Sequence, residues 1–86
     1  MPTTLTREDV SAILCRLAAD QAGTDPTKVT LDTHLFNDLN FDSLDATEYA
    51  MTIEDELEVS VSDEEAGRVK TVRDAAEIVW PLLGFV

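Results

Sequence analysis

The stretch Asp38-Leu39-Asn40-Phe41-Asp42-Ser43-Leu44-Asp45 joins a segment without a regular apolar period to a helical one. It predicts a helix that starts at Asp42 or Ser43 and runs to about Glu58. A serine hydroxyl at such a start is exposed. Free backbone N–H groups and the positive end of the helix dipole favour a phosphodiester there, by about 0.3–1 kcal/mol. The stretch therefore predicts a helical fold with a site at Ser43 that suits an anionic attachment.

Apolar residues fall on two faces of this helix. At about 100° per residue, one narrow stripe forms the predicted core face. That stripe consists of Ala46, Tyr49, Ala50, Ile53 and Leu57. Leu44 and Met51 lie nearly opposite, next to Glu48 and Asp55, where a solvated face would carry only polar residues. We therefore expect Leu44 and Met51 to be contact residues for a partner.

Before this helix, the sequence predicts a first helix and a long connection. Thr6 is the expected N-cap and Asp9 its approximate capping-box partner, and the helix spans roughly residues 7–21 before Gly23 ends the pattern. Its core positions are Val10, Ile13, Leu14, Leu17 and Ala18. Residues 24–40 have no sustained period but too many apolar side chains for a solvated loop, so this loop must pack on the core. Pro26, capped by Asp25, could open one short helical turn there.

After it, two more helices are expected. Ser62 and Glu65 have capping-box spacing for a helix of about six residues that Gly67 ends. Thr71 with Asp74 gives another approximate cap for a last helix, whose core positions are Val72, Ala75, Ala76 and Val79. Pro81 should kink or end it near Trp80. Without a convincing strand, residues 1–86 are predicted to form a single all-α domain, a small four-helix bundle of three main helices and one short helix with a long ordered loop between helices one and two.

Composition limits the possible partners and location. Eighteen Asp and Glu against six Lys and Arg give a formal charge of -12, which opposes binding to nucleic acids or anionic membranes and predicts partners with basic patches. Cys15 alone cannot form an intramolecular disulfide, which fits a reducing compartment. The N-terminus lacks a basic segment followed by an apolar run, and no apolar run is long enough to span a membrane. We expect a soluble, cytoplasmic, monomeric protein.

The motif Asp38-Leu39-x-x-Asp42-Ser43-Leu44-Asp45, followed by Glu48, Met51 and residues 54–57, resembles the acyl carrier protein family around its modified serine. The resemblance extends from about Leu35 to Val79 and includes the spacing of the last two helices. It implies that a phosphopantetheinyl transferase attaches 4'-phosphopantetheine from coenzyme A to Ser43. The thiol of the arm would then hold acyl groups as thioesters. The chain would be a non-catalytic carrier that serves fatty-acid or polyketide-type biosynthetic enzymes.

The resemblance also implies roles for individual residues. Asp42 and Leu44 would flank the attachment point as recognition residues. The partner-binding residues would be Leu44, Thr47, Glu48, Met51, Glu54 and Asp55. The acyl-chain lining would be Ala46, Tyr49, Ala50 and Ile53. Two features depart from the family. Asn40 replaces a usual glycine but tolerates a positive φ, and the bulky Phe41 and Tyr49 suggest a preference for short or polar acyl groups.

The same residues also resemble parts of other functional sites. An aminoacyl, D-alanyl or peptidyl-type carrier, or an unmodified acidic helical adaptor, remains as an alternative. Asp38-x-Asn40-x-Asp42 imitates half of a calcium loop, but Ser43, Ala46 and Tyr49 occupy the remaining ligand and turn positions, so we expect no metal. A serine hydrolase lacks its motif, with His34 as the only imidazole. Cys15 is expected to be an idle, partly exposed thiol, and residues 80–86 a tail folded over the core.

Overall fold

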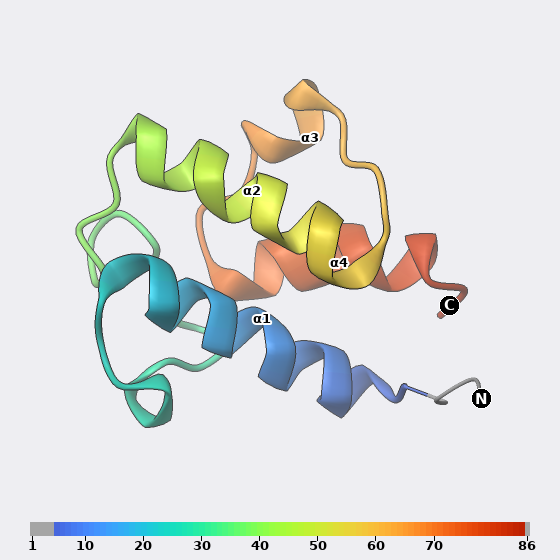
Figure 1. Ribbon diagram of the computed structural model, residues 1–86, viewed down its shortest axis with the longest axis horizontal. Coiled ribbons are helices and arrows are strands. Elements are labelled where there is room, and N and C mark those ends of the chain that lie inside the picture. Colours follow the sequence, from blue (N-terminus) through green and yellow to red (C-terminus); the bar gives the residue numbers. More distant parts are fainter. Residues whose placement is uncertain (1–4, 86) are drawn as a thin grey trace.

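A computed structural model describes residues 5–85 and shows an all-helical fold (Figure 1). The elements are α1 (Arg7–Ala22), the short 3-10 turn η1 (Pro26–Lys28), α2 (Ser43–Leu57), α3 (Asp63–Ala66) and α4 (Val72–Leu82). Over these residues the only β-type pairing is an isolated antiparallel bridge between His34 and Thr71. The predicted bundle, with its short helix and its long loop between the first two helices, is confirmed.

All four α-helices begin with a capping box, in which the N-cap side chain accepts from the amide three residues later and the side chain of that later residue accepts from the N-cap amide. The pairs are Thr6 with Asp9, Asp42 with Asp45, Ser62 with Glu65, and Thr71 with Asp74. Each N-cap contributes typically about 1 kcal/mol. The helix starts are therefore encoded locally, and the three boxes expected from spacing are confirmed.

Helix ends agree less well with expectation. Gly23 ends α1 at φ 72°, and Asp25 caps η1, both as predicted. However, α3 has four residues rather than about six, and α4 continues through Pro81 to Leu82 instead of ending near Trp80. Because Pro81 lies in the last turn, its missing N–H removes a single helical bond. The backbone after Pro81 still forms a helical hydrogen bond, because the amide of Leu83 donates to the carbonyl of Val79 at 3.1 Å.

The last residues fold back over the core, as expected. Trp80, Leu83 and Phe85 are half-buried and pack against it, while Leu82 remains exposed. The guanidinium of Arg7 lies 5.4 Å from the centroid of the Trp80 ring, which joins this segment to the start of α1. Val86, the remaining residue of the expected tail, lies outside the described part of the chain.

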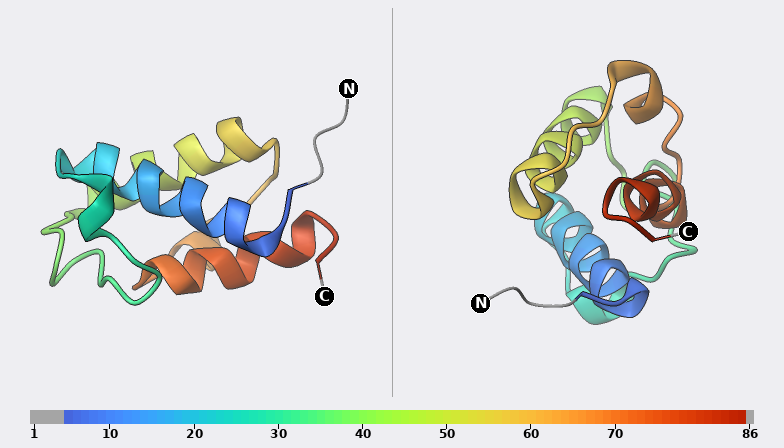
Figure 2. Two further views of the ribbon diagram at one scale, coloured as in Figure 1. Left: turned by 90° about the horizontal axis from the view of Figure 1, so that it is seen from below. Right: turned by 90° about the vertical axis from the view of Figure 1, so that its right-hand side faces the viewer.

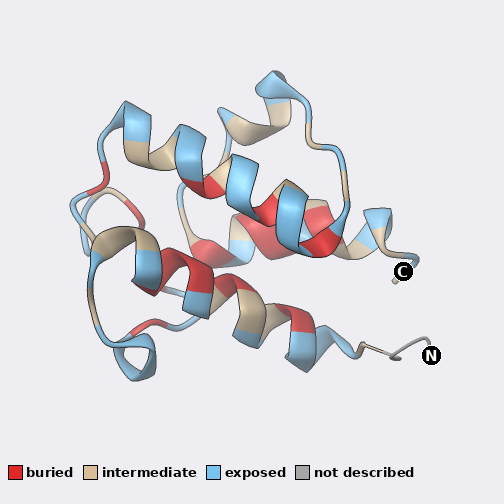
Figure 3. Ribbon diagram, viewed as in Figure 1, coloured by how far each residue is buried: buried red, intermediate tan, exposed pale blue. Residues whose placement is uncertain are grey.

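The core lies between α1, α2 and α4. Figure 3 shows the buried residues on the sides of these helices that face one another. The predicted core positions of α4 are all buried, as are Tyr49, Ile53 and Leu57 on α2. Ala46 and Ala50, from the same α2 stripe, are half-buried. On α1, Ile13 is half-buried and the other predicted positions are buried. Val29, Leu35 and Phe41 add buried side chains from the long loop.

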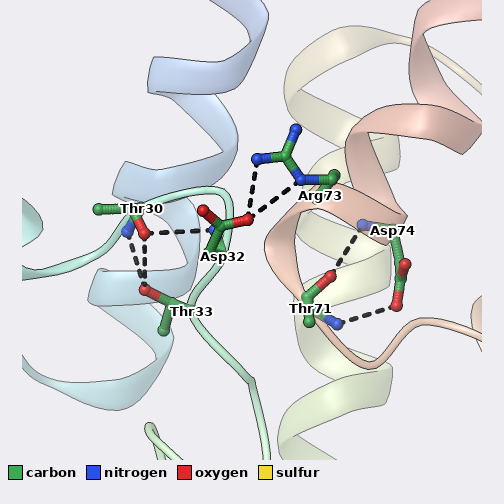
Figure 4. Close-up of polar contacts among 6 residues, drawn as sticks. All are labelled: Thr30, Asp32, Thr33, Thr71, Arg73 and Asp74. Atoms are coloured by element: carbon green, nitrogen blue, oxygen red, sulfur yellow. Dashed lines mark hydrogen bonds and ion pairs between the residues drawn. The ribbon is translucent and has the colours of Figure 1, made fainter.

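The long loop is tied to the start of α4 (Figure 2, left). The amide of Leu35 donates to the carbonyl of Lys70 at 2.8 Å, and the amide of Arg73 donates to the carbonyl of Leu31 at 2.8 Å. Figure 4 shows the side chains beside this connection. There the guanidinium of Arg73 donates twice to one carboxylate oxygen of Asp32, at 2.8 and 3.2 Å. These bonds fix the loop that leads to Ser43.

Candidate functional site

Ser43 is the first residue of α2, immediately after its capping box. The carboxylate of Asp42 accepts from the amide of Asp45 at 2.8 Å, and the carboxylate of Asp45 accepts from the amide of Asp42 at 3.1 Å. Ser43 itself is exposed, and its hydroxyl makes no hydrogen bond to any of residues 5–85. A free hydroxyl therefore lies at the positive end of a 15-residue helix.

A tight turn delivers the chain to this helix. Asn40 has φ 59°, so the left-handed conformation expected at this position is confirmed. Its amide donates to the carbonyl of Phe36 at 3.1 Å. The next residue, Phe41, is buried, and its amide donates to the carbonyl of Leu35 at 3.0 Å. Phe41 is buried immediately before Asp42, and Ser43 is exposed immediately after it. The chain therefore leaves the core at Asp42 and presents Ser43 to solvent.

The outer face of α2 has the mixture of apolar and acidic side chains that the sequence predicted. Leu44 and Met51 are 64% and 59% exposed, which confirms that both lie outside the core. Thr47, Glu48 and Asp55 are exposed beside them. Exposed methionine and leucine among carboxylates give a surface that a partner can cover with apolar contacts, while the charges guide its approach.

Several of the acidic side chains on α2 also bond to other parts of the fold. Glu54 is half-buried, and its carboxylate accepts from the amide of Val61 at 2.8 Å. Glu48 accepts from the side-chain amide of Gln21 at 2.9 Å, and the same amide nitrogen donates to Asp45 at 2.9 Å. The Gln21 bond, followed by the bond from the amide of Asp42, lowers the pKa of Asp45. The carboxylate of Asp45 therefore stays ionised beside Ser43.

Two hollows lie beneath and beside this helix. A groove of about 410 Å³ runs between α2 and α3 next to Ser43. Its lining includes Phe36, Ser43, Thr47, Met51, Glu54 and Asp63. An adjoining apolar cavity of about 30 Å³ lies deeper in the core and shares the lining residues Ala46, Ala50, Val61, Ala66 and Val69 with the groove. Its lining includes Leu35, Ala46, Tyr49, Ala50, Ile53 and Val79, so the four predicted lining residues of α2 do meet around one space.

Other candidate groups have structural uses. The Nδ1 atom of His34 accepts from the amide of Asn37 at 3.0 Å, which leaves this nitrogen unavailable as a base for a serine nucleophile. Asp38 accepts from the amide of His34 at 2.8 Å. Within residues 5–85, no three Asp, Glu, His or Cys side chains converge in a way that could hold a metal ion. Cys15 is half-buried, and burial raises the pKa of its thiol, which keeps it protonated and poorly reactive.

The site suits a group attached through a phosphodiester. The Ser43 hydroxyl is accessible, free of competing bonds and placed at a helix start, and the neighbouring groove offers open space. None of the helices in the described part of the chain has the length and apolar composition needed to cross a membrane.

Comparison with known proteins agrees with this geometry. Residues 12–79 match the family model described as "Phosphopantetheine attachment site". The acyl carrier protein of Thermosynechococcus vestitus is 43% identical over 72 residues, which cover 84% of each chain. The solved structure of the acyl carrier protein from Enterococcus faecalis aligns with a TM-score of 0.74 at 28% identity, over 91% of this chain and 99% of that one. The chain therefore belongs to the acyl carrier protein family, whose cofactor is 4'-phosphopantetheine.

Proposed function

We propose that Ser43 is the attachment point of 4'-phosphopantetheine and that the chain carries acyl groups as thioesters on this arm. The observation that carries the proposal is the exposed, unbonded Ser43 hydroxyl at the start of α2, beside an open groove. Of the other serines in residues 5–85, Ser11 donates to the carbonyl of Arg7 and Ser62 is the N-cap of α3. Ser60 is exposed but lies in the loop before α3 and not at a helix start.

The chain's own residues prepare this serine for attachment. The bond formed is from Ser43 Oγ to the phosphorus nearest the pantetheine arm. The pyrophosphate bond of coenzyme A breaks, adenosine 3',5'-bisphosphate leaves, and the transferase takes the serine proton. The free N–H groups of the first turn favour the resulting phosphodiester by about 0.3–1 kcal/mol. Asp42 and Leu44, exposed on either side, would be read by the transferase.

The acidic charge of the chain indicates the kind of partner that it meets. The chain has the acidic charge expected of a carrier that visits enzymes with basic patches, and we infer that these belong to fatty-acid or polyketide-type biosynthesis. Aminoacyl or peptidyl cargo is the alternative. The use of His34 as a hydrogen-bond acceptor in the loop supports a carrier that performs no chemistry itself. A monomer in a reducing, cytoplasmic compartment fits the single thiol of Cys15.

The experiment that tests the proposal is incubation of the apo-protein with coenzyme A and a phosphopantetheinyl transferase. Intact-mass measurement on the wild type and on Ser43→Ala, followed by peptide mapping, identifies the modified residue. Modification at another serine, or none with several competent transferases, would remove Ser43 from this role.

Docking on the outer face of α2 gives a second prediction. Replacing Glu48 and Asp55 with lysine should lower the kcat/KM of the transferase for this carrier roughly tenfold at low salt, because favourable charges accelerate encounter. The same pair should also flatten the dependence of kcat/KM on salt. The measurement is the initial rate of modification over a series of salt concentrations.

The matched control for this pair is Glu8→Lys with Glu77→Lys, two exposed positions on α1 and α4. Both double variants change the net charge from -12 to -8, because each glutamate or aspartate to lysine change adds two charges. Only the α2 pair should have the large effect, and helical circular dichroism should be retained in both. Equal losses in the two variants would mean that net charge, and not this face, governs docking.

A further inference from the structure

Tyr49 on α2 lines the apolar cavity of the core but not the groove beside Ser43, so it forms an inner wall of the space beneath that groove. It follows Ser43 by six residues, which places it about 9 Å along the helix at 1.5 Å per residue. It is 2% exposed and lines the apolar cavity of about 30 Å³. A cavity of this size has room for about two water-sized groups, since each needs roughly 10–15 Å³. The interior as it stands cannot hold a long chain.

Tyr49 is also held firmly in place. Its hydroxyl donates to the carbonyl of Leu14 on α1 at 3.0 Å, in a buried bond. Its ring packs edge-on against Phe41, with the ring centroids 5.8 Å apart and the planes at 78°. Burial raises the pKa of the hydroxyl, so it stays a neutral donor. Moving the ring aside would leave a buried hydroxyl without a partner, which is unfavourable in an apolar core. Tyr49 therefore bridges α1 and α2 as a fixed inner wall of the cavity, and is not a loose side chain.

The groove beside Ser43 differs from this cavity in both size and polarity. Its volume is about 410 Å³, and Thr47, Glu54 and Asp63 place oxygen atoms among its apolar residues. A short acyl group, with or without polar substituents, can lie in such a groove with its polar atoms hydrated or hydrogen-bonded. A long saturated chain would there expose most of its methylene groups to water.

We propose that Tyr49, anchored to the Leu14 carbonyl, limits the depth of the apolar cavity that adjoins the groove, and so makes this protein a carrier of short or polar acyl groups that lie in the groove between α2 and α3. The inference rests on the proposed function, because it takes Ser43 as the point of attachment. It names the class of cargo, which that proposal leaves open.

The test is thermal melting of the protein loaded with acetyl, butanoyl, octanoyl or dodecanoyl groups. The transferase supplies each from the corresponding acyl-coenzyme A, and intact mass verifies complete loading at Ser43. In the wild type, octanoyl and dodecanoyl should raise the Tm no more than butanoyl does. A chain that enters a core should instead raise the Tm by about 3–6 °C for each methylene buried.

Two substitutions at Tyr49 separate the hydroxyl from the ring. Tyr49→Leu shortens the side chain and removes the bridge to Leu14, so the octanoyl and dodecanoyl forms should now melt above the acetyl form. Tyr49→Phe keeps the ring but not the anchor, and should give an intermediate gain. The control is Leu57→Val, which truncates another buried α2 residue outside the cavity lining and should leave the chain-length profile flat.

The position of the loaded acyl chain can also be measured directly, which keeps the test independent of the stability of the variants. In the wild type loaded with ¹³C-labelled octanoyl, nuclear Overhauser contacts should involve Met51 or Thr47 of the groove and not Ile53 or Val79 of the cavity. Contacts to Ile53 and Val79, or a wild-type Tm that climbs with chain length as steeply as in Tyr49→Leu, would overturn the inference. If Ser43 cannot be loaded at all, it is the proposed attachment point that fails.

Discussion

Treatment with coenzyme A and a phosphopantetheinyl transferase should add the mass of one phosphopantetheine group to the wild-type chain and nothing to Ser43→Ala. The expected effect is all-or-none, because the substitution removes the oxygen that would bond to phosphorus. The fold should survive, since the Ser43 hydroxyl makes no hydrogen bond to any other described residue and alanine is a good helix former. Intact mass gives the stoichiometry, and far-ultraviolet circular dichroism verifies that the variant is helical.

Two further serines provide the controls. Ser60→Ala should be modified like the wild type, because Ser43 is unchanged and Ser60 lies in the loop outside the helices. Ser62→Ala should also be modified, although loss of the α3 cap should cost about 0.5–2 kcal/mol of stability. An arm found on Ser43→Ala, or lost from Ser60→Ala, would contradict the assignment of Ser43.

The helices could be predicted because their starts are encoded within a few residues. Thr6 with Asp9 and Thr71 with Asp74 are side-chain to backbone pairs that need no tertiary contact. Asn40 is similar, since few residues tolerate its φ of 59°. The exposure of Met51 followed from helical periodicity alone. These features depend on short-range geometry, which the order of residues determines directly.

Helix ends were predicted less well, because packing overrides the local signal there. Pro81 does not stop α4, since the helix loses one bond and the half-buried Trp80, Leu83 and Phe85 hold the following backbone against the core. Propensity penalises an internal proline, but in a last turn the penalty is small enough for tertiary contacts to offset.

The parts of the site that escaped prediction depend on long-range pairs. The side-chain amide of Gln21 donates to Asp45 and Glu48, which lie 24 and 27 positions further along the sequence. The guanidinium of Arg73 donates to Asp32, which lies 41 positions earlier. Polar pairs of this kind leave no periodic signal in one sequence. The anchoring of Tyr49 to the Leu14 carbonyl was likewise invisible, because any buried backbone oxygen could have been its partner. Such contacts become apparent only when α1, α2 and the loop are placed in space.

Leu35→Ala should destabilise the protein by about 2–5 kcal/mol, the range for truncation of a buried leucine. Leu35 is 1% exposed and lines the core cavity, so the deleted carbons enlarge a space that is already present. Stability for 86 residues is expected to be about 4–13 kcal/mol, and a net charge of -12 reduces it further at low salt. The loss is therefore a large share of the total, and the Tm should fall by more than about 8 °C.

The position of Leu35 decides which part of the molecule loosens. Its amide bonds to Lys70 at the start of α4, and its carbonyl accepts from Phe41 immediately before the site. Hydrogen exchange should therefore accelerate first in the amides of residues 35–41. The matched control is Leu44→Ala, the same deletion at a side chain that is 64% exposed, which should change stability by no more than about 0.5 kcal/mol. Thermal melts of both variants at low and at high salt make the measurement. If Leu35→Ala melted as high as Leu44→Ala, the loop would not be part of the core. Interactions other than the packing of Leu35 would then have to hold residues 35–41 in place before Ser43.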